Sequence, residues 1–243
     1  GYRHIDTASI YLNEKAVGDA IKESGINRKE MFITTKLWIQ DADYDKAKKA
    51  FQMSMEKLGL DYLDLYLLHM PFGNYYAAWK AMEELYEAGY IRTIGCCNFY
   101  KDRLIDFVAH TKITPAINQI ETHPFFQRWE EQNLMKEYNI TLESWGPLAE
   151  GKNNIFNNEI LKTIGKKYNK TIAQVILRWL TQRNIPIIPK SVNKDRIIEN
   201  SKIFDFTLDD NDMNIIKTLD NNKNIIFLND DADFIKQLLK LKY

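Results

Sequence analysis

The stretch of sequence that decides the class of fold runs from residue 31 to residue 69 and reads MFITTKLWIQDADYDKAKKAFQMSMEKLGLDYLDLYLLH. It begins and ends with short, nearly continuous apolar runs, residues 31–37 and 63–69, which are typical of parallel strands covered on both faces. Between them, apolar residues recur at helical spacing over residues 45–58, and Gly59 follows where a helix favours a left-handed C-terminal residue. The stretch therefore predicts a strand, a helix and a second, parallel strand.

The same alternation extends over the whole chain. Helical patterns include residues 77–88, which end at Gly89, and a helix through Leu180 that begins with a capping box of Thr171 and Gln174. Repeated strand–helix units form parallel sheets with right-handed crossovers. With the two runs above, five further apolar runs bring the predicted strands to seven: RHID (3–6), IRTIGCCN (91–98), PAINQI (115–120), ITLESW (140–145) and IPIIPKS (185–191).

A closed barrel and an open, doubly wound sheet both fit this alternation. The sequence contains neither G-x-G-x-x-G nor G-x-x-x-x-G-K-[ST], which are the usual nucleotide-binding loops of open sheets. It also has no Gly/Ser-rich linker and no break in composition. We therefore expect one α/β barrel domain that spans residues 1–243.

The bulk composition is typical of an ordinary soluble, globular protein. The formal net charge is zero, so no global field points to nucleic acid or to an anionic membrane. No apolar run approaches the ~20 residues that cross a bilayer, and no signal peptide is evident. The two cysteines, Cys96 and Cys97, are adjacent and cannot cross-link a fold, which suits the reducing cytoplasm. The histidines show no metal-ligand spacing, so we expect no metal site: His4, His69, His110 and His123.

Polar and aromatic side chains stand at the end of every predicted strand. In a β/α barrel the active site forms at the carboxyl ends of the strands. Each of these residues has a structural explanation when taken alone, although a lysine that closes an apolar strand is costly unless it is paired. Together they predict a functional rim, made of Asp6 with Tyr11 in the loop that follows it, Lys36, His69, Asn98, Gln119, Trp145 and Lys190.

Four of these residues form a chemically coherent acid–base group. A tyrosine hydroxyl has an ordinary pKa of about 10, and a neighbouring ammonium lowers it. We expect Lys36 to act in this way on Tyr11, and Asp6 to hold Lys36 in place. His69 would orient the substrate oxygen. The group predicts a general acid for a carbonyl oxygen that becomes an alcohol.

Seven stretches together resemble the aldo-keto reductases, most of all the short-loop microbial branch that includes diketogluconate and glyoxal reductases. They follow in order along the whole chain: GYRHIDTASIYLNE (1–14), TTKLW (34–38), YLLHMPFG (66–73), IRTIGCCNF (91–99), INQIETHP (117–124), ESWGPLAEG (143–151) and IPIIPKSVNKDRIIEN (185–200). The resemblance implies a TIM (β/α)8 barrel and NADPH-dependent reduction of small aldehydes and ketones. It places the catalytic tetrad on Asp6, Tyr11, Lys36 and His69, with Tyr11 as the acid while hydride moves from the nicotinamide to the carbonyl carbon.

The resemblance also implies a nicotinamide cofactor site without a Rossmann domain. Asn98 and Gln119 match the residues that bind the carboxamide, and Cys97 stands where the family usually has a serine, although a thiol is the weaker donor. Trp145 matches the aromatic residue that stacks on the nicotinamide, beside Gly146 and Leu148. The cations of residues 190–200 gather at the start of a helix, which favours an anion such as the 2′-phosphate of NADPH. That segment supplies Lys190, Ser191, Val192 and Arg196, with Glu199 and Asn200 toward the adenine.

The substrate-facing residues are expected to be Tyr11, Trp38, His69 and Phe72. The loop after His69 is short, which predicts a shallow pocket for a small carbonyl compound, and we expect a monomer. Two other functions remain open: a Schiff-base aldolase that uses Lys36 as the nucleophile, and a non-catalytic module that binds NADPH. The aldolase leaves Asn98, Gln119 and Trp145 unexplained, and the complete tetrad argues against the second.

The number of predicted strands differs from the number in the family. Seven are predicted, whereas the family has eight, and in relatives its first strand and an N-terminal hairpin precede the segment that matches GYRHIDTA. We therefore expect a barrel that is N-terminally incomplete, lacking that strand and the hairpin. An inactive truncated form is a further alternative on this ground.

Overall fold

The structure, a computed structural model, describes residues 1–228 and 231–241. The chain divides into two compact units. The N-terminal unit comprises Tyr2–Gln119, Leu134–Thr141 and Lys236–Tyr243, and the C-terminal unit comprises Ile120–Asn133 and Leu142–Ile235 together with Gly1. The single-domain organisation expected from the sequence stays a prediction.

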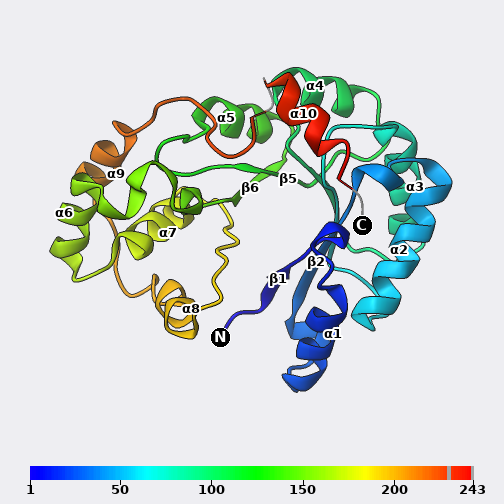
Figure 1. The fold of residues 1–243 in the computed structure, drawn as a ribbon, viewed down its shortest axis with the longest axis horizontal. Helices are drawn as coiled ribbons and strands as arrows, with labels where there is room; N and C mark the ends of the chain where they lie inside the picture. The colour runs from blue at the N-terminus through cyan, green and yellow to red at the C-terminus, as the bar shows by residue number, and fades with distance from the viewer. Residues whose placement is uncertain (229–230, 242–243) are drawn as a thin grey trace. The chain divides into compact units, whose positions relative to one another are not determined.

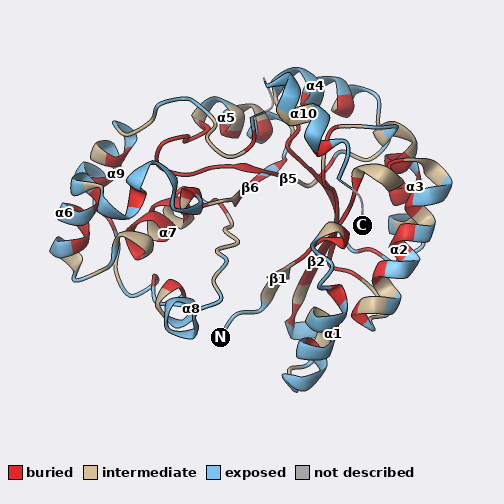
Figure 2. Cartoon of the chain, in the orientation of Figure 1, coloured by how far each residue is buried: buried red, intermediate tan, exposed pale blue. Residues whose placement is uncertain are grey.

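Six strands are hydrogen-bonded to one another in chain order, and the pairs from β1 to β5 are parallel. Six of the predicted strands are thereby confirmed, because parallel strands buried on both faces leave continuous apolar runs in the sequence. Figure 2 shows β1 as intermediate in burial, whereas most residues of β2 to β6 are buried. Their bounds are β1 (His4–Asp6), β2 (Phe32–Leu37), β3 (Leu65–Leu68), β4 (Ile94–Cys97), β5 (Ile117–Glu121) and β6 (Thr141–Trp145).

The helices of the N-terminal unit follow its strands. They are α1 (Glu14–Glu23), α2 (Tyr44–Leu58), α3 (Tyr75–Glu87) and α4 (Lys101–Ala109), with short 3-10 turns at η1 (Ser9–Tyr11), η2 (Arg28–Glu30) and η3 (Ile39–Asp41). Helices α2 and α3 pack side by side and contact β2 and β3 respectively (Figure 1). Helix α2 ends at Gly59 with φ 64°, as predicted. Gly18 lets α1 approach α2 closely, because a Cβ there would lie 2.3 Å from the carbonyl oxygen of Leu58.

The C-terminal unit is mainly helical. The predicted capping box of Thr171 and Gln174 is confirmed at the start of α7, whose apolar face is buried. Its elements are η4 (Ala149–Asn157), α6 (Glu159–Tyr168), α7 (Ile172–Gln182), α8 (Lys194–Ser201) and α9 (Asp210–Lys217), and it shares α5 (Trp129–Glu137) and α10 (Ala232–Leu238) with the other unit.

The predicted seventh strand at residues 185–191 is not formed as a strand in the structure. Only an isolated parallel bridge between Ser144 and Ile187 is present there. Ser144 donates its backbone N–H to Pro186 at 2.8 Å, and Ile188 donates to Ser144 at 3.4 Å. Pro186 and Pro189 have no amide hydrogen, so they interrupt the ladder on both sides of the bridge.

The described residues show neither a membrane-spanning helix nor a cluster of metal-ligating side chains. None of the helices in this part of the chain is both long and apolar enough to cross a membrane. The same residues include no group of three or more His, Cys, Asp or Glu side chains that could hold a metal ion.

Candidate active site

The ends of β1 and β2 bring Asp6 and Lys36 together. Asp6 pairs in register with Thr34, and Lys36 lies two residues further along β2 on the same face. The Lys36 Nζ forms an ion pair with Asp6 Oδ1 and also donates to the carbonyl oxygen of Thr7 at 3.0 Å. Lys36 is fully buried. This pairing explains how an apolar strand tolerates a lysine at its end.

Tyr11 and His69 lie beside this ion pair. Tyr11 closes the turn η1, with 51% of its surface exposed, and its ring centroid is 5.2 Å from the Lys36 Nζ. The ring of His69 meets the ring of Tyr11 edge-on, with 5.6 Å between centroids, and the ring of Trp38 at 5.1 Å. The four residues of the predicted tetrad are therefore gathered at one place, with the tyrosine accessible from solvent.

The net effect on Tyr11 differs from the expectation. Although half of its surface is exposed, loss of hydration is the largest influence and raises the pKa of the phenol. Lys36 lowers this pKa, which is the predicted direction, but Asp6 and Cys97 oppose it, and the pKa is raised overall. The expected net lowering of the Tyr11 pKa was wrong, because the burial of a side chain cannot be read from residue types. A raised pKa keeps the phenol protonated at neutral pH.

Lys36 is charged at neutral pH, whereas His69 is neutral. Burial alone lowers the pKa of Lys36, but Asp6, Tyr11 and Cys97 outweigh burial and raise it, so the ammonium stays charged. Burial, and then the charge of Lys36, lower the pKa of His69 well below its ordinary value. His69 is therefore a neutral imidazole at neutral pH. A neutral ring offers one N–H, which suits a hydrogen bond to a carbonyl oxygen.

Three further predicted residues adjoin the tetrad in the N-terminal unit. Cys97 on β4 pairs in register with Gln119 on β5. The Gln119 Nε2 donates to Asp6 Oδ2 at 3.0 Å, and the Cys97 thiol lies 3.9 Å from Gln119 Oε1. Asn98 follows β4 with φ 63°, and its Nδ2 donates to the carbonyl oxygen of His69 at 3.2 Å. All three side chains are buried beside the predicted tetrad.

The two remaining residues expected to face the substrate are less accessible than Tyr11. Trp38 is 3% exposed, and its Nε1 donates to the carbonyl oxygen of Leu241 at 3.2 Å. Phe72 is partly buried, and the guanidinium of Arg103 lies 5.5 Å from its ring centroid. The structure brings Trp38 into contact with His69, whereas Phe72 contacts the guanidinium of Arg103.

The loop after Trp145, in the C-terminal unit, is sharply turned. Gly146 has φ 61°, and the position that its Cβ would take is 2.9 Å from Cδ1 of Ile226. The carbonyl oxygens of Gly146 and Leu148 accept backbone N–H bonds from Ala149 at 2.8 Å and Gly151 at 3.0 Å. Ile226 therefore packs directly against this turn.

A buried carboxylate that was not predicted from the sequence, Glu121, holds the backbone of residues 225–227, which include Ile226. Glu121 is fully buried at the end of β5. Its Oε1 accepts backbone N–H bonds from Ile225 at 2.8 Å and Ile226 at 3.1 Å, and its Oε2 accepts one from Phe227 at 2.8 Å. His123 lies 3.1 Å from Oε1. The hint in the sequence was an acidic residue that directly follows an apolar strand.

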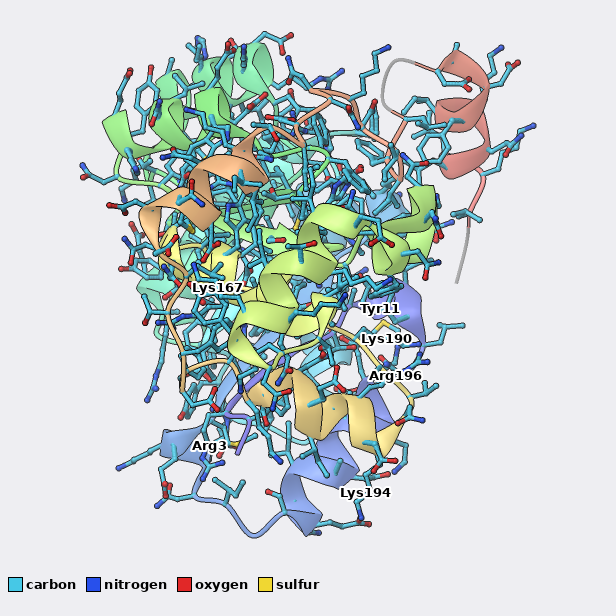
Figure 3. All side chains as sticks on the ribbon, turned by 90° about the vertical axis from the view of Figure 1, so that its left-hand side faces the viewer. Arg3, Tyr11, Lys167, Lys190, Lys194 and Arg196 are labelled. Atoms are coloured by element: carbon cyan, nitrogen blue, oxygen red, sulfur yellow. The ribbon has the colours of Figure 1, made fainter. Side chains whose placement is uncertain are left out.

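The segment of residues 190–200 leads into α8. Asn193 caps the helix by accepting the backbone N–H of Arg196 at 3.1 Å. The side chains of Lys190 and Arg196, labelled with Lys194 in Figure 3, are exposed, and within the described residues they make no hydrogen bond or ion pair. Unpaired cations at a helix start fit a phosphate group. Ser191 lies in the same loop, where its Oγ accepts the backbone N–H of Asn193 at 3.1 Å.

The other members of this segment differ in their freedom to bind a ligand. Val192 is 88% exposed. Glu199 accepts a hydrogen bond from the hydroxyl of Thr171 at 2.7 Å, and Asn200 is buried. The two residues expected near the adenine are therefore engaged with, or covered by, the protein itself.

Comparison with known proteins identifies relatives along most of the chain. The model of the "Aldo/keto reductase family" matches residues 1–221. Glyoxal reductase of Bacillus subtilis (strain 168) is 46% identical over 226 residues, which are 93% of this chain and 81% of the relative. A crystal structure of an aldo-keto reductase enzyme from a Medee basin deep-sea metagenome library is 45% identical, with a TM-score of 0.93 over 96% of this chain and 87% of that one.

A further solved structure holds a cofactor. The crystal structure of a Bombyx mori aldo-keto reductase in complex with NADP is 34% identical, with a TM-score of 0.89 over 95% of this chain and 82% of that one. These identities and TM-scores show that the chain is similar to both solved structures in sequence and in fold. The predicted α/β barrel fold class is thereby confirmed.

Proposed function

This chain belongs to the aldo/keto reductase family, and we propose that Asp6, Tyr11, Lys36 and His69 carry out its reaction. It is an NADP-dependent oxidoreductase that reduces carbonyl compounds to alcohols. The observation that carries the assignment of residues is the buried ion pair of Lys36 and Asp6 beside the ring of Tyr11.

Each residue has one task in this proposal. The Tyr11 hydroxyl donates its proton to the carbonyl oxygen, and its raised pKa keeps that proton in place until the substrate accepts it. Lys36 stabilises the phenolate that remains, because its ammonium stays charged. Asp6 holds Lys36. Neutral His69 offers an N–H to the substrate oxygen and fixes its orientation.

The residues present fit a nicotinamide cofactor. NADPH supplies the hydride when it is bound. Buried amides of Asn98 and Gln119 offer donors and acceptors suited to a carboxamide, and the exposed cations Lys190 and Arg196 suit a 2′-phosphate. Trp145, with Gly146 and Leu148, supplies an aromatic face and a shaped turn.

The substrates that we propose are small aldehydes such as glyoxal. The similar Bacillus subtilis protein is named for that compound. The accessible Tyr11 and the short loop of residues 70–76 also favour a small, open site. We further propose a monomer that acts in the cytoplasm, which suits two buried, unoxidised cysteines.

The Schiff-base alternative is not favoured by the structure. A nucleophilic lysine must lose its proton, whereas the pKa of Lys36 is raised by its pairing with Asp6. Lys36 is also fully buried, so a substrate carbonyl has no direct access to its Nζ.

The test is NADPH consumption with glyoxal, followed by absorbance, for the wild-type protein and for Tyr11→Phe. The phenylalanine keeps the ring contact with His69 and removes only the proton donor. We expect kcat to fall about 10²- to 10⁴-fold. A Tyr11→Phe protein with wild-type kcat would overturn the role of Tyr11, and trapping of glyoxal on Lys36 by borohydride would support the aldolase instead.

A further inference from the structure

We infer that Gln119 is a positioning residue of the acid–base group: by donating to Asp6 it sets the charge that Asp6 presents to Lys36 and Tyr11. The inference deepens the proposed function and rests on it for the role of Tyr11. It starts from the hydrogen bond of 3.0 Å between Gln119 Nε2 and Asp6 Oδ2.

This hydrogen bond reaches across the interior of the N-terminal unit. Asp6 ends β1 and Gln119 lies on β5, and the sheet order places β2, β3 and β4 between them. The side chain of Asp6 is 6% exposed and Gln119 is 2% exposed, so water does not compete for either partner. The Gln119 amide on β5 therefore donates to Asp6 from a strand that is not a neighbour of β1 in the sheet.

Both oxygens of Asp6 are committed to a partner. Oδ1 pairs with the Lys36 ammonium, and Oδ2 accepts from Gln119. With both oxygens engaged, the carboxylate cannot rotate without breaking a buried hydrogen bond, which is costly. Gln119 thereby keeps one oxygen directed at Lys36, whose second anchor is the carbonyl oxygen of Thr7.

The same hydrogen bond moderates the charge felt by Tyr11. The groups that act on the phenol are Lys36, which lowers its pKa, and Asp6 and Cys97, which raise it. The adjoining His69 ring is neutral at neutral pH. An amide that donates to Asp6 draws negative charge away from the phenol and adds no charge of its own. Loss of that donor strengthens the influence of Asp6 and raises the pKa of Tyr11 further.

The two ends of the Gln119 amide serve different neighbours. Its nitrogen faces Asp6, while its oxygen faces the thiol of Cys97 at the long distance of 3.9 Å. The oxygen is the end that suits the N–H of a carboxamide. A donor bound at the oxygen polarises the amide and strengthens donation from its nitrogen. Gln119 therefore links the proposed carboxamide site to the proton donor.

The decisive variant is Gln119→Met, which keeps the approximate length of the side chain and removes the donor. The readout is the titration of Tyr11 in the cofactor-free protein, by NMR of ring-labelled tyrosine, with Tyr11→Phe used to assign the signal. We expect the pKa of Tyr11 to rise by about one unit, and the alkaline limb of the kcat profile to move in the same direction.

Gln119→Glu provides a second readout that a purely structural role would not give. When protonated, the introduced carboxyl donates to Asp6 in place of the amide; when ionised, it repels Asp6. Because Gln119 also faces the proposed carboxamide site, the readout is the pH dependence of the variant and not its absolute rate: we expect its activity to fall, relative to its own value at acid pH, as the introduced group ionises. An activity that is equally low at every pH contradicts the inference.

The matched control is Asn118→Ala on the same strand. Asn118 is also a buried amide, but its Nδ2 donates to the carbonyl oxygen of Phe99 at 2.6 Å and not to the tetrad. This variant should lose stability and leave the Tyr11 titration in place. An unchanged titration in Gln119→Met, or an equal shift in Asn118→Ala, overturns the inference. Neither result depends on turnover, so failure of the proposed function is detected separately.

Discussion

The tetrad of the N-terminal unit and the segment of residues 190–200 in the C-terminal unit handle charge in opposite ways. Lys36 is fully buried and already paired with Asp6. The side chains of Lys190 and Arg196 are exposed and, within the described residues, have no ionic or hydrogen-bonding partner. With the roles proposed above, the groups that perform chemistry are preorganised by the fold, which avoids reorganisation during the reaction. The groups proposed to bind a charged ligand are left without a partner until that ligand binds.

The largest effect is expected for Lys36→Met, which removes the buried cation of the tetrad. The variant leaves Asp6 buried beside Gln119 without its cation. We expect kcat to fall at least 10²-fold, and the free energy of unfolding to fall by about 3–5 kcal/mol, measured by urea unfolding. Lys162→Met is the control, because the Lys162 side chain is half exposed and, among the described residues, pairs with Glu159 alone at the surface.

The stability loss in Lys36→Met should depend on pH in one direction. The folded pKa of Lys36 is raised, so its contribution is complete below the unfolded pKa of about 10.4 and is lost as pH rises through the folded value. A loss that is constant from neutral to strongly alkaline pH would show that the ion pair is not its source.

Glu121→Gln sharpens the comparison, because it tests a buried charge in the C-terminal unit. Glutamine retains one acceptor oxygen but turns an N–H₂ group toward backbone donors of residues 225–227. We expect a loss of about 3 kcal/mol in the free energy of unfolding at neutral pH.

The pH dependence of this loss has the opposite sign to that of Lys36. Burial raises the pKa of Glu121, but hydrogen bonds from His123 and the backbone outweigh burial and lower it. The contribution is therefore present above the unfolded pKa of about 4.3 and disappears as pH falls through the folded value. Glu150→Gln, at an exposed carboxylate of the same unit, should show neither effect.

Arg196→Ala tests the exposed cations of residues 190–200. We expect NADPH to bind about 10- to 100-fold more weakly and NADH to bind nearly as before, because only NADPH carries the 2′-phosphate. Fluorescence titration of both cofactors measures the effect, with Lys162→Ala as the control cation. Equal weakening of both cofactors would refute a phosphate contact.

The smallest expected effect is the pH dependence of the wild-type protein. Because the pKa of Tyr11 is raised, its acid form persists above the ordinary value of about 10. Carbonyl reduction should therefore show no loss of kcat from Tyr11 ionisation between neutral pH and pH ~10. A decline well below that point, absent in a variant that lacks the Tyr11 hydroxyl, contradicts the raised pKa.

The sequence predicted most of the framework and the identity of the central residues. Continuous apolar runs and helical spacing located six strands, and strand ends located Asp6, Lys36 and His69. These features depend on local pattern. The net direction of the Tyr11 pKa shift and the hydrogen bond from the Gln119 amide to Asp6 were not predicted, because both depend on burial and on residues distant in the chain. The expected strand at residues 185–191 failed for a local reason, the two prolines.

The hydrogen bond between Gln119 and Asp6 also bears on when the site comes into being during folding. It joins residues 113 positions apart in the chain, so it forms only after a long loop has closed. A nascent chain that has emerged only through β4 already contains all four tetrad residues but lacks this tie. The pKa of Tyr11 therefore reaches its final value late in folding, after β5 has joined the sheet.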